Sequence, residues 1–210
     1  PKTILITGST DGIGFETAKT LVSLGHNVLI HGRNLEKLKK VEEVLNKLTN
    51  NIALKSYCAD LSNLEDVKIL AENISKNHKN IDVIINNAGI YKTTSPITKD
   101  GLDIRFVVNT IAPYFLTKLL IPLFNKDSRI INLSSAAQAK VDIEAMNGKV
   151  LLNHGEAYAQ SKLALTMFTL VQAQELRNKL SSIISVNPAS LLATKMVKEG
   201  YGIIGNVDSH

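Results

Sequence analysis

The sequence of 210 residues has few of the features that cross-link a protein chain or attach it to a membrane. Its single cysteine, Cys58, makes an internal disulfide impossible. It has no tryptophan and only five prolines. No basic leader with an apolar segment precedes the first β-rich run, and we expect no apolar run of membrane-spanning length. We therefore predict a cytoplasmic protein without a stable membrane anchor. Cys58 is expected to be a buried, inert thiol, with a reactive thiol as the alternative.

The charge is basic overall but contains no long block of one sign. Lysine and arginine number 24 against 19 acidic residues, which gives a net charge of +5. The densest basic cluster, Lys37, Lys39 and Lys40, lies among the glutamates Glu36, Glu42 and Glu43 and contains no aromatic residue. Such a pattern is typical of the solvated face of a helix, not of a surface that follows nucleic-acid phosphates. We therefore expect no nucleic-acid partner, and one globular domain over residues 1–210.

Short β-rich runs alternate with helical patterns along the chain, without an internal repeat or linker. We predict strands at 3–7, 27–31, 52–57, 81–86, 129–133 and 183–186. Helices are predicted after the loop at 7–14 and at 35–48, 64–75, 101–123 and 157–180, with a loop at 136–155. Parallel neighbouring strands need crossover connections, so this alternation predicts an α/β protein with a single Rossmann-type, doubly wound parallel sheet and helices on both faces. Ligands of such sheets bind at the carboxyl ends of the strands.

A glycine-rich segment, Thr7-Gly-Ser-Thr-Asp-Gly-Ile-Gly14, lies between the first predicted strand and helix. Gly8 permits a tight exit from the strand, Gly12 lets the backbone approach a pyrophosphate, and Gly14 lets the helix pack closely on the strand. The N-terminus of the helix offers free N–H groups to phosphates. A structural glycine turn is the alternative. The candidate dinucleotide-binding residues of this loop are Gly8, Ser9, Thr10, Asp11, Gly12, Ile13 and Gly14.

The end of the second predicted strand distinguishes NADP from NAD. An acid there would bind the adenosine ribose hydroxyls and repel a 2′-phosphate. The stretch Leu29-Ile-His-Gly-Arg33-Asn34 has no acid before Glu36. Arg33, with Asn34 beside it, can offer two parallel N–H groups to a phosphate. NADP(H) is therefore the preferred cofactor and NAD(H) the alternative. Asp11 argues mildly against NADP, and a solvated loop charge is the other role open to Arg33.

Tyr158 and Lys162 are four residues apart on a predicted helix, so they share one face. A tyrosine with an ordinary pKa of about 10 is a poor base at neutral pH. A nearby ammonium and a positive nicotinamide ring favour the phenolate, and an opposite charge at close range lowers a pKa by roughly 1–3 units. The pair is therefore a candidate for general acid–base catalysis.

Four motifs in this order resemble the short-chain dehydrogenase/reductase family over nearly the whole chain. They are the glycine loop, Asn86-Asn-Ala-Gly89, Asn109 and Tyr158-Ala-Gln-Ser-Lys162. The resemblance implies an oxidoreductase that transfers a hydride between a nicotinamide and a carbonyl or alcohol substrate. The alternative is a catalytically weak NADP(H)-binding sensor or scaffold. The resemblance also implies a homodimer or homotetramer that packs through residues 101–123 and 157–180. No metal site is predicted.

The resemblance assigns further roles along the cofactor. Asp60 and Leu61 are expected to contact the adenine, although Asp60 is equally suited to be a loop acid before a helix. Beside the adenosine ribose, the family pattern has three residues, here Asn87, Ala88 and Gly89. Tyr158 and Lys162 are expected to contact the cofactor as well, with Lys162 on the nicotinamide ribose.

The resemblance implies two more catalytic residues. After the fifth strand the family has a hydroxyl that binds the reacting oxygen; Ser135 fits this role, whereas Ser134 is expected to be a strand-end or cap hydroxyl. Asn109 matches the family asparagine that holds a water linking Lys162 to solvent, and a helix-kink role is compatible with it. In the implied reduction Ser135 positions the carbonyl oxygen and Tyr158 protonates it.

The second half departs from the family pattern at three places. Ser135 and Tyr158 are 23 residues apart, a longer spacing than in many members. With residues 101–109, this spacing resembles the retinol-dehydrogenase-related branch, which favours lipophilic aldehydes, ketones and alcohols. Pro188 is followed by alanine instead of the usual glycine, and Thr194 is the candidate contact to the nicotinamide carboxamide. Members continue further, so we expect the substrate-covering lid and last strand to be missing from the chain.

Overall fold

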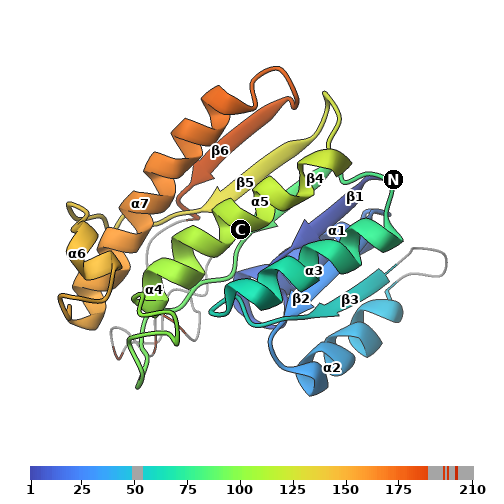
Figure 1. The fold of residues 1–210 in the computed structure, drawn as a ribbon. Coiled ribbons are helices and arrows are strands. Elements are labelled where there is room, and N and C mark those ends of the chain that lie inside the picture. The colour runs from blue at the N-terminus through green and yellow to red at the C-terminus, as the bar shows by residue number, and fades with distance from the viewer. Residues whose placement is uncertain (49–53, 189–195, 197, 199–201, 203–210) are drawn as a thin grey trace.

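Six strands form one fully parallel sheet in the computed structural model (Figure 1), which describes residues 1–48 and 54–188 together with Met196, Lys198 and Gly202. The strand order is β3-β2-β1-β4-β5-β6. Successive strands are added outward from β1 on both sides, which makes the sheet doubly wound. The direction in which strands are added reverses between β1 and β4. The strands are β1 Thr3–Ile6, β2 Asn27–Gly32, β3 Leu54–Cys58, β4 Val83–Asn86, β5 Arg129–Leu133 and β6 Ser182–Val186.

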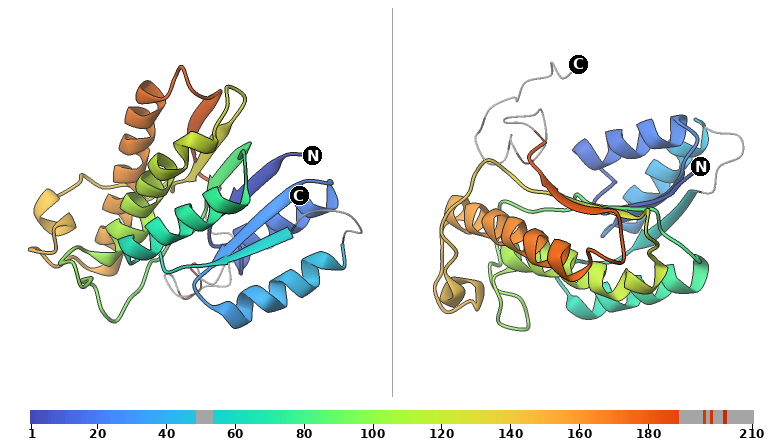
Figure 2. Two further views of the ribbon diagram at one scale, coloured as in Figure 1. Left: turned by 45° about the vertical axis from the view of Figure 1, so that its right-hand side comes forward. Right: turned by 90° about the horizontal axis from the view of Figure 1, so that it is seen from above.

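Helices cover both faces of this sheet. Figure 2 shows α1 and α2 on one side and α3, α5 and α7 on the other. The helices are α1 Gly12–Ser23, α2 Leu35–Asn46, α3 Leu64–Asn77, α4 Ile104–Phe106, α5 Ala112–Leu120, α6 Ile143–Met146 and α7 His154–Glu175, with a π-helical turn η1 Val107–Ile111 and a 3₁₀ turn η2 Ile121–Leu123. The predicted fold class is confirmed.

The core consists of two apolar layers that the alternation of side chains along the strands creates. In β1, Leu5 belongs to the layer that α3 and α5 cover, whereas Ile4 and Ile6 belong to the layer that α1 and α2 cover. All three side chains are almost completely buried. Strands buried on both faces are expected to have a continuous apolar run, as β1 has in Ile4, Leu5 and Ile6.

The edge strand β3 corrects one expectation. Cys58 is exposed, not buried. Its neighbours Tyr57 and Ala59 are buried, and successive side chains of a strand point to opposite faces. Since β3 lies at the edge of the sheet, the outward-facing position at its end stays open to solvent. The predicted beginning of this strand, residues 52 and 53, lies outside the described residues.

Among the other segments, three differ most from the predicted boundaries. The helix predicted at 101–123 begins at Ile104, after Asp103 caps it, and it contains the π turn and ends in a 3₁₀ turn. The loop predicted at 136–155 contains the short helix α6, which Asp142 caps. The last long helix begins at His154, three residues earlier than predicted, and ends at Glu175.

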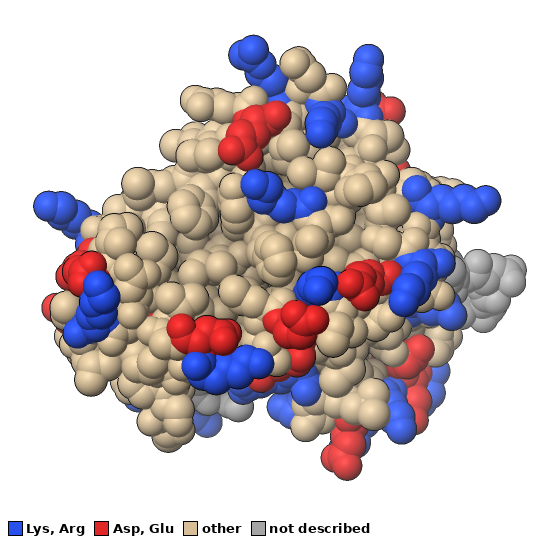
Figure 3. All heavy atoms as spheres, in the orientation of Figure 1, with Lys and Arg blue, Asp and Glu red and all other residues tan. Residues whose placement is uncertain are grey.

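The stretch Ile104–Leu123 corrects the expectation that no apolar run reaches membrane-spanning length. Among the described residues it is the one helical stretch long and apolar enough to span a membrane, with a mean hydropathy of 1.5. Most of this stretch is buried against the sheet and the neighbouring helices, which is also the property of a core helix. Figure 3 shows that charged side chains of both signs are interspersed on the face that carries α3, α5 and α7, without a stripe of one sign.

Candidate active site

The glycine loop leaves β1 in a conformation that other residues rarely adopt. Gly8 and Gly12 have positive φ angles, of 65° and 53°. A Cβ on Gly14 would lie 2.4 Å from the carbonyl oxygen of Gly8 and from Nδ2 of Asn87, so no side chain fits there. Asp11 caps α1 by accepting a hydrogen bond from the Gly12 N–H at 2.8 Å. The loop therefore brings the N-terminus of α1 to the carboxyl end of β1, as its spacing predicts.

The Asn86–Gly89 segment holds this loop from the neighbouring strand. Asn87 Nδ2 donates to the carbonyl oxygens of Thr7 and Gly8, both at 2.9 Å. The backbone N–H groups of Asn87 and Ala88 donate to the Thr7 hydroxyl at 3.1 Å. Gly8 lies so close that a Cβ on it would be 2.8 Å from the Cα of Ala88. The two motifs thus form one unit across the β1–β4 reversal of the sheet.

His31 is a residue of this site that the sequence analysis does not predict. Its Nδ1 accepts from the N–H of Gly8 at 3.2 Å, and its Nε2 donates to the carbonyl oxygen of Ala59 at 3.1 Å. Burial lowers the pKa of the imidazole to about 4, so the ring is neutral near pH 7. Ser9 adds hydrogen bonds to the His31 backbone. A lone histidine two residues before Arg33, in an otherwise apolar strand, is the signal that could have found it.

A cavity of about 600 Å³ runs along the carboxyl ends of the strands. The predicted site residues that line it are Gly8, Thr10, Asp11, Gly12, Ile13, Arg33, Asn34, Asp60, Leu61, Asn87, Ala88, Gly89, Tyr158, Lys162 and Pro188. Four predicted residues are not in its lining: Ser9, Gly14, Asn109 and Ser135. Thr194 lies outside the described residues. The strands thus bring most of the predicted cofactor residues to a single cavity, at the sheet edge expected of this topology.

Two cationic side chains, of Arg33 and Lys37, line the cavity at the end where β2 leads into α2. Arg33 is exposed, and Asn34 caps α2 by accepting from the Lys37 N–H at 2.9 Å. Lys37 also lines the cavity and was not predicted. Asp60 accepts from the Ser62 N–H at 2.9 Å, in the turn before α3. This bond fits the loop-acid role of Asp60, and the cavity lining leaves the adenine role open to it.

Lys162 extends from α7 into the other end of the cavity. The residue is 4% exposed, and its Nζ donates to the carbonyl oxygen of Leu133 at 2.7 Å. The same nitrogen lies 5.7 Å from the centroid of the Tyr158 ring. Burial disfavours the ammonium and lowers its pKa to about 8. Tyr158 and Lys162 therefore meet on one helix face, as their spacing predicts.

The two serines after β5 have different surroundings. Ser134 Oγ donates to the carbonyl oxygen of Lys162 at 3.1 Å and lies 2.9 Å from Thr166 Oγ1. These contacts anchor the strand end to α7, as expected for Ser134, although this residue also borders the cavity. Ser135 Oγ accepts from the Ala137 N–H at 3.1 Å. That bond uses a lone pair of Ser135 and leaves its proton available for an acceptor.

Asn109 is completely buried in the π turn η1. Its Oδ1 accepts from the Ile90 N–H at 2.8 Å, and its Nδ2 donates to the Ile90 carbonyl oxygen at 3.0 Å and to Ser161 Oγ at 2.9 Å. Ser161 in turn donates to the carbonyl oxygen of Tyr158 at 2.7 Å. The side chain therefore fixes the loop after β4 to the helix that carries Tyr158.

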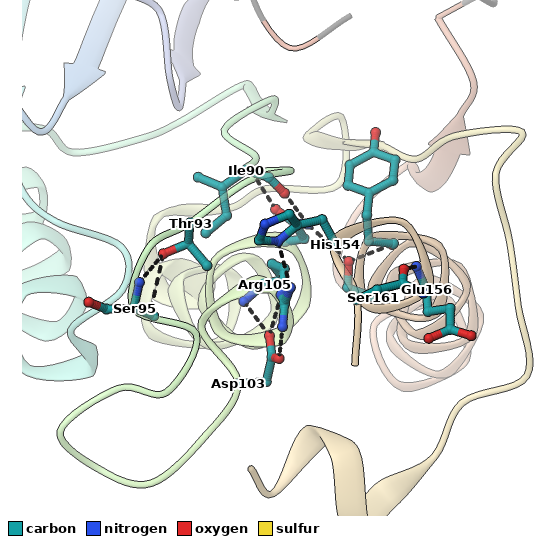
Figure 4. Close-up of polar contacts among 11 residues, drawn as sticks. Ile90, Thr93, Ser95, Asp103, Arg105, His154, Glu156 and Ser161 are labelled. Carbon is teal, nitrogen blue, oxygen red and sulfur yellow. Dashed lines mark hydrogen bonds and ion pairs between the residues drawn. The ribbon is translucent and has the colours of Figure 1, made fainter. Parts of the chain in front are cut away.

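A buried ion pair fixes the start of α7 (Figure 4), and it too was not predicted. Asp103 and Arg105 are each 1% exposed, and the Arg105 guanidinium donates two hydrogen bonds to the Asp103 carboxylate. Arg105 Nη1 also lies 3.2 Å from Nδ1 of His154, the first residue of α7. Tyr158 follows one helical turn later. An arginine on the apolar side of a predicted helix is the signal for this pair.

No group of three or more His, Cys, Asp or Glu side chains that could hold a metal ion occurs within the part of the chain that the structure describes.

Replacement of Lys162 by methionine is expected to change how stability depends on pH. Because the folded-state pKa of about 8 is below the ordinary 10.5, the folded protein binds fewer protons than the unfolded chain between these values. The unfolding free energy from this group therefore rises with pH across that window. Below pH 8, Lys162→Met should be more stable than the wild type by up to about 3 kcal/mol. Urea unfolding from pH 7 to 10.5 measures the difference. A difference that does not shrink as the pH rises, or the same trend in the exposed control Lys68→Met, would refute this prediction.

The comparisons with known proteins agree with the geometry. Residues 2–201 match the short chain dehydrogenase family. The chain is 32% identical to retinol dehydrogenase 13 of Homo sapiens over 192 residues, which are 89% of this chain and 58% of that protein. It is 30% identical to retinol dehydrogenase 12 of Bos taurus, covering 95% of this chain and 64% of the relative. The chain therefore spans about three fifths of the length of these relatives.

Two solved structures similar to this chain contain NADP. A metagenomic short-chain oxidoreductase in complex with NADP is 29% identical with a TM-score of 0.71, and the match covers 90% of this chain and 83% of that one. A short chain dehydrogenase from Shigella flexneri 2a complexed with NADP is 28% identical with a TM-score of 0.77, covering 96% and 82%. With the family match over nearly all its length, the chain belongs to the short-chain dehydrogenase/reductase family, in the branch related to the retinol dehydrogenases.

Proposed function

We propose that this chain is the catalytic domain of an oxidoreductase that uses NADP(H) to interconvert carbonyl compounds and alcohols. One observation carries the proposal: Tyr158 and the buried ammonium of Lys162 border the same cavity as the glycine loop and Arg33. A dinucleotide that extends along the carboxyl ends of the strands would reach from one group to the other.

The residues around the cavity fit NADP(H). The glycine loop leaves no room for side chains at Gly8 and Gly14 and turns the N–H groups of α1 toward a pyrophosphate. Arg33 and Asn34, with Lys37, suit a 2′-phosphate, and the solved relatives that contain NADP support this cofactor over NAD(H). The other proposed contacts are Ser9, Thr10, Asp11, Gly12 and Ile13 in the loop, Asp60 and Leu61 at the adenine, Asn87, Ala88 and Gly89 at the adenosine ribose, Tyr158 and Lys162 at the nicotinamide ribose, and Pro188 and Thr194 at the carboxamide.

When bound, NADPH supplies the hydride for the carbonyl carbon. The Ser135 hydroxyl donates a hydrogen bond to the carbonyl oxygen and fixes its position. Tyr158 gives its phenolic proton to that oxygen as negative charge develops there. The Lys162 ammonium stabilises the phenolate that remains. Asn109 joins the loop after β4 to α7 through its side-chain amide. Its proposed role is to hold the water that returns a proton to Lys162.

The substrate that we propose is a lipophilic aldehyde, ketone or alcohol. The cavity lining includes the apolar side chains of Ile90, Val108, Leu133 and Met196, together with the polar side chains of Lys92 and Ser134. Several relatives carry the names retinol dehydrogenase and polyprenol dehydrogenase, and they are about 30% identical. Tight NADPH binding without turnover on a broad panel of aldehydes and ketones would instead favour a sensor or scaffold.

Removal of the Tyr158 hydroxyl tests the mechanism. Tyr158→Phe keeps the ring but cannot donate a proton, so kcat for aldehyde reduction should fall by about 100-fold or more. The dissociation constant of NADPH should change far less. Tyr114→Phe, in α5 and outside the cavity, serves as the control and should behave as the wild type. Turnover by Tyr158→Phe at the wild-type rate would remove Tyr158 from the acid–base role.

Arg33→Ala tests the choice of cofactor. A charge-assisted bond to the 2′-phosphate contributes about 1.5–3 kcal/mol, so the dissociation constant of NADPH should rise by roughly 10- to 150-fold. That of NADH should change little, because it lacks this phosphate. Fluorescence titration with both cofactors measures the two effects, with Arg177→Ala as an exposed control. Equal weakening of both cofactors would contradict a 2′-phosphate contact.

We also propose that the protein forms a homodimer or homotetramer that packs through α5 and α7. We further propose that it is located in the cytoplasm. The outer face of α7 exposes Met167, Leu170 and Val171, and Leu170 is 64% exposed. The exposed free thiol of Cys58 fits a reducing compartment. Sedimentation velocity should show a dimer or tetramer for the wild type and dissociated subunits for the Leu170→Asp variant. Cell fractionation should recover the protein in the soluble fraction. A wild type that is monomeric at micromolar concentration, or that pellets with membranes, would contradict the respective proposal.

A further inference from the structure

Tyr91 lies two residues beyond the Asn86–Gly89 segment and lines the same cavity as Tyr158. Its ring centroid is 5.2 Å from that of Tyr158, and the two ring planes are tilted by 52°. Aromatic rings at this separation attract each other by offset and edge contacts. Since Tyr158 is the proposed proton donor, Tyr91 is next to the position that the substrate oxygen has to occupy.

The backbone before Tyr91 and the tip of its ring are both held. Asn109 binds the N–H and the carbonyl of Ile90, the preceding residue, at 2.8 and 3.0 Å. At the other end, a Cβ on Gly155 would lie 3.3 Å from the Tyr91 hydroxyl oxygen, so the ring reaches the first turn of α7. A side chain fixed at its base and packed at its tip loses little further entropy when a ligand binds against it.

Tyr91 lies in a different part of the cavity from the cations at the β2–α2 end. It follows β4, whereas Arg33 and Lys37 follow β2, and β1 lies between these two strands. Besides the polar side chains of Lys92, Ser134 and Lys162, the lining contributed by the segments after β4 includes four apolar side chains: Ile90, Val108, Leu133 and Met196. Tyr91 therefore adds a second aromatic face beside the Tyr158 ring.

We propose that Tyr91 determines substrate specificity, by favouring carbonyl compounds whose reacting carbon carries a flat, unsaturated or aromatic group. Such a group stacks on or edges against the tyrosine ring and gains an electrostatic attraction beyond the burial of its area. A saturated group of the same size gains only the burial. This inference rests on the proposed function, because it takes the reacting carbon to lie beside Tyr158.

Two aldehydes with the same number of heavy atoms test this specificity: benzaldehyde, which is flat, and cyclohexanecarbaldehyde, which is not. The quantity measured is the ratio of their kcat/KM values with NADPH. Comparing this ratio between protein variants cancels the difference in intrinsic reactivity of the two aldehydes. The variants are Tyr91→Leu, Tyr91→Phe and, as a matched control, Tyr114→Leu, because Tyr114 pairs with Phe168 at 5.2 Å and 48° outside this cavity.

Tyr91→Leu is expected to lower the ratio roughly three- to tenfold, chiefly through a higher KM for benzaldehyde. Tyr91→Phe keeps the ring and should keep the ratio, and Tyr114→Leu should leave it as in the wild type. Tyr91→Met provides the same comparison if Tyr91→Leu does not fold.

An unchanged ratio in the variants that lack the ring would overturn the specificity role of Tyr91 while leaving the oxidoreductase in place. A fall of the same size in Tyr114→Leu would overturn it too. If the wild type binds NADPH but reduces neither aldehyde, the proposed function fails first and the inference with it.

Discussion

The hydrogen bonds of Asn87 to the glycine loop are the contacts on which the rest of the site depends. One amide group reaches two successive carbonyl oxygens, of Thr7 and Gly8, at the point where the winding of the sheet reverses. It joins the end of β4 to the loop after β1, and Gly14 must lack a side chain for this contact to exist. On the other side His31 ties the same loop to the ends of β2 and β3. The loop is therefore fixed before any ligand arrives, which reduces the entropy lost on binding.

Among the residues that the structure describes, two cationic side chains, of Arg105 and Lys162, are buried, and their surroundings differ. Arg105 has the carboxylate of Asp103 as its partner, so its charge is balanced, and its further contact to His154 holds the start of α7. Lys162 donates a hydrogen bond to the carbonyl oxygen of Leu133, and burial lowers the pKa of its ammonium. A buried pair mainly fixes geometry, whereas an ammonium without a carboxylate partner is available to stabilise developing negative charge. We therefore propose that Arg105 positions α7, whereas Lys162 acts on the Tyr158 phenolate.

Local patterns in the sequence were enough to predict the sheet, the glycine loop and the Tyr158–Lys162 pair. Their signals are periodic or short-range: β-branched runs, a glycine spacing, and two residues one turn apart. The contacts of His31 with Gly8 and Ala59, and of Arg105 with His154, could not be predicted in this way, because these partners lie 23 to 49 residues apart and only the folded chain brings them together. The π turn at Asn109 was also missed, because it is a change in hydrogen bonding that composition does not reveal. Cys58 was placed wrongly because a strand pattern does not show that the strand lies at an edge.

The central claim is that this preorganised cavity directs a hydride from NADPH to a carbonyl carbon beside Tyr158. The measurement that tests it most directly uses NADPH deuterated at the transferring C4 position, an aldehyde substrate and ordinary water. Mass spectrometry of the alcohol should find one deuterium on the carbinol carbon, with the hydroxyl proton derived from solvent. An alcohol without that deuterium, or no alcohol while NADPH is bound, would contradict the account.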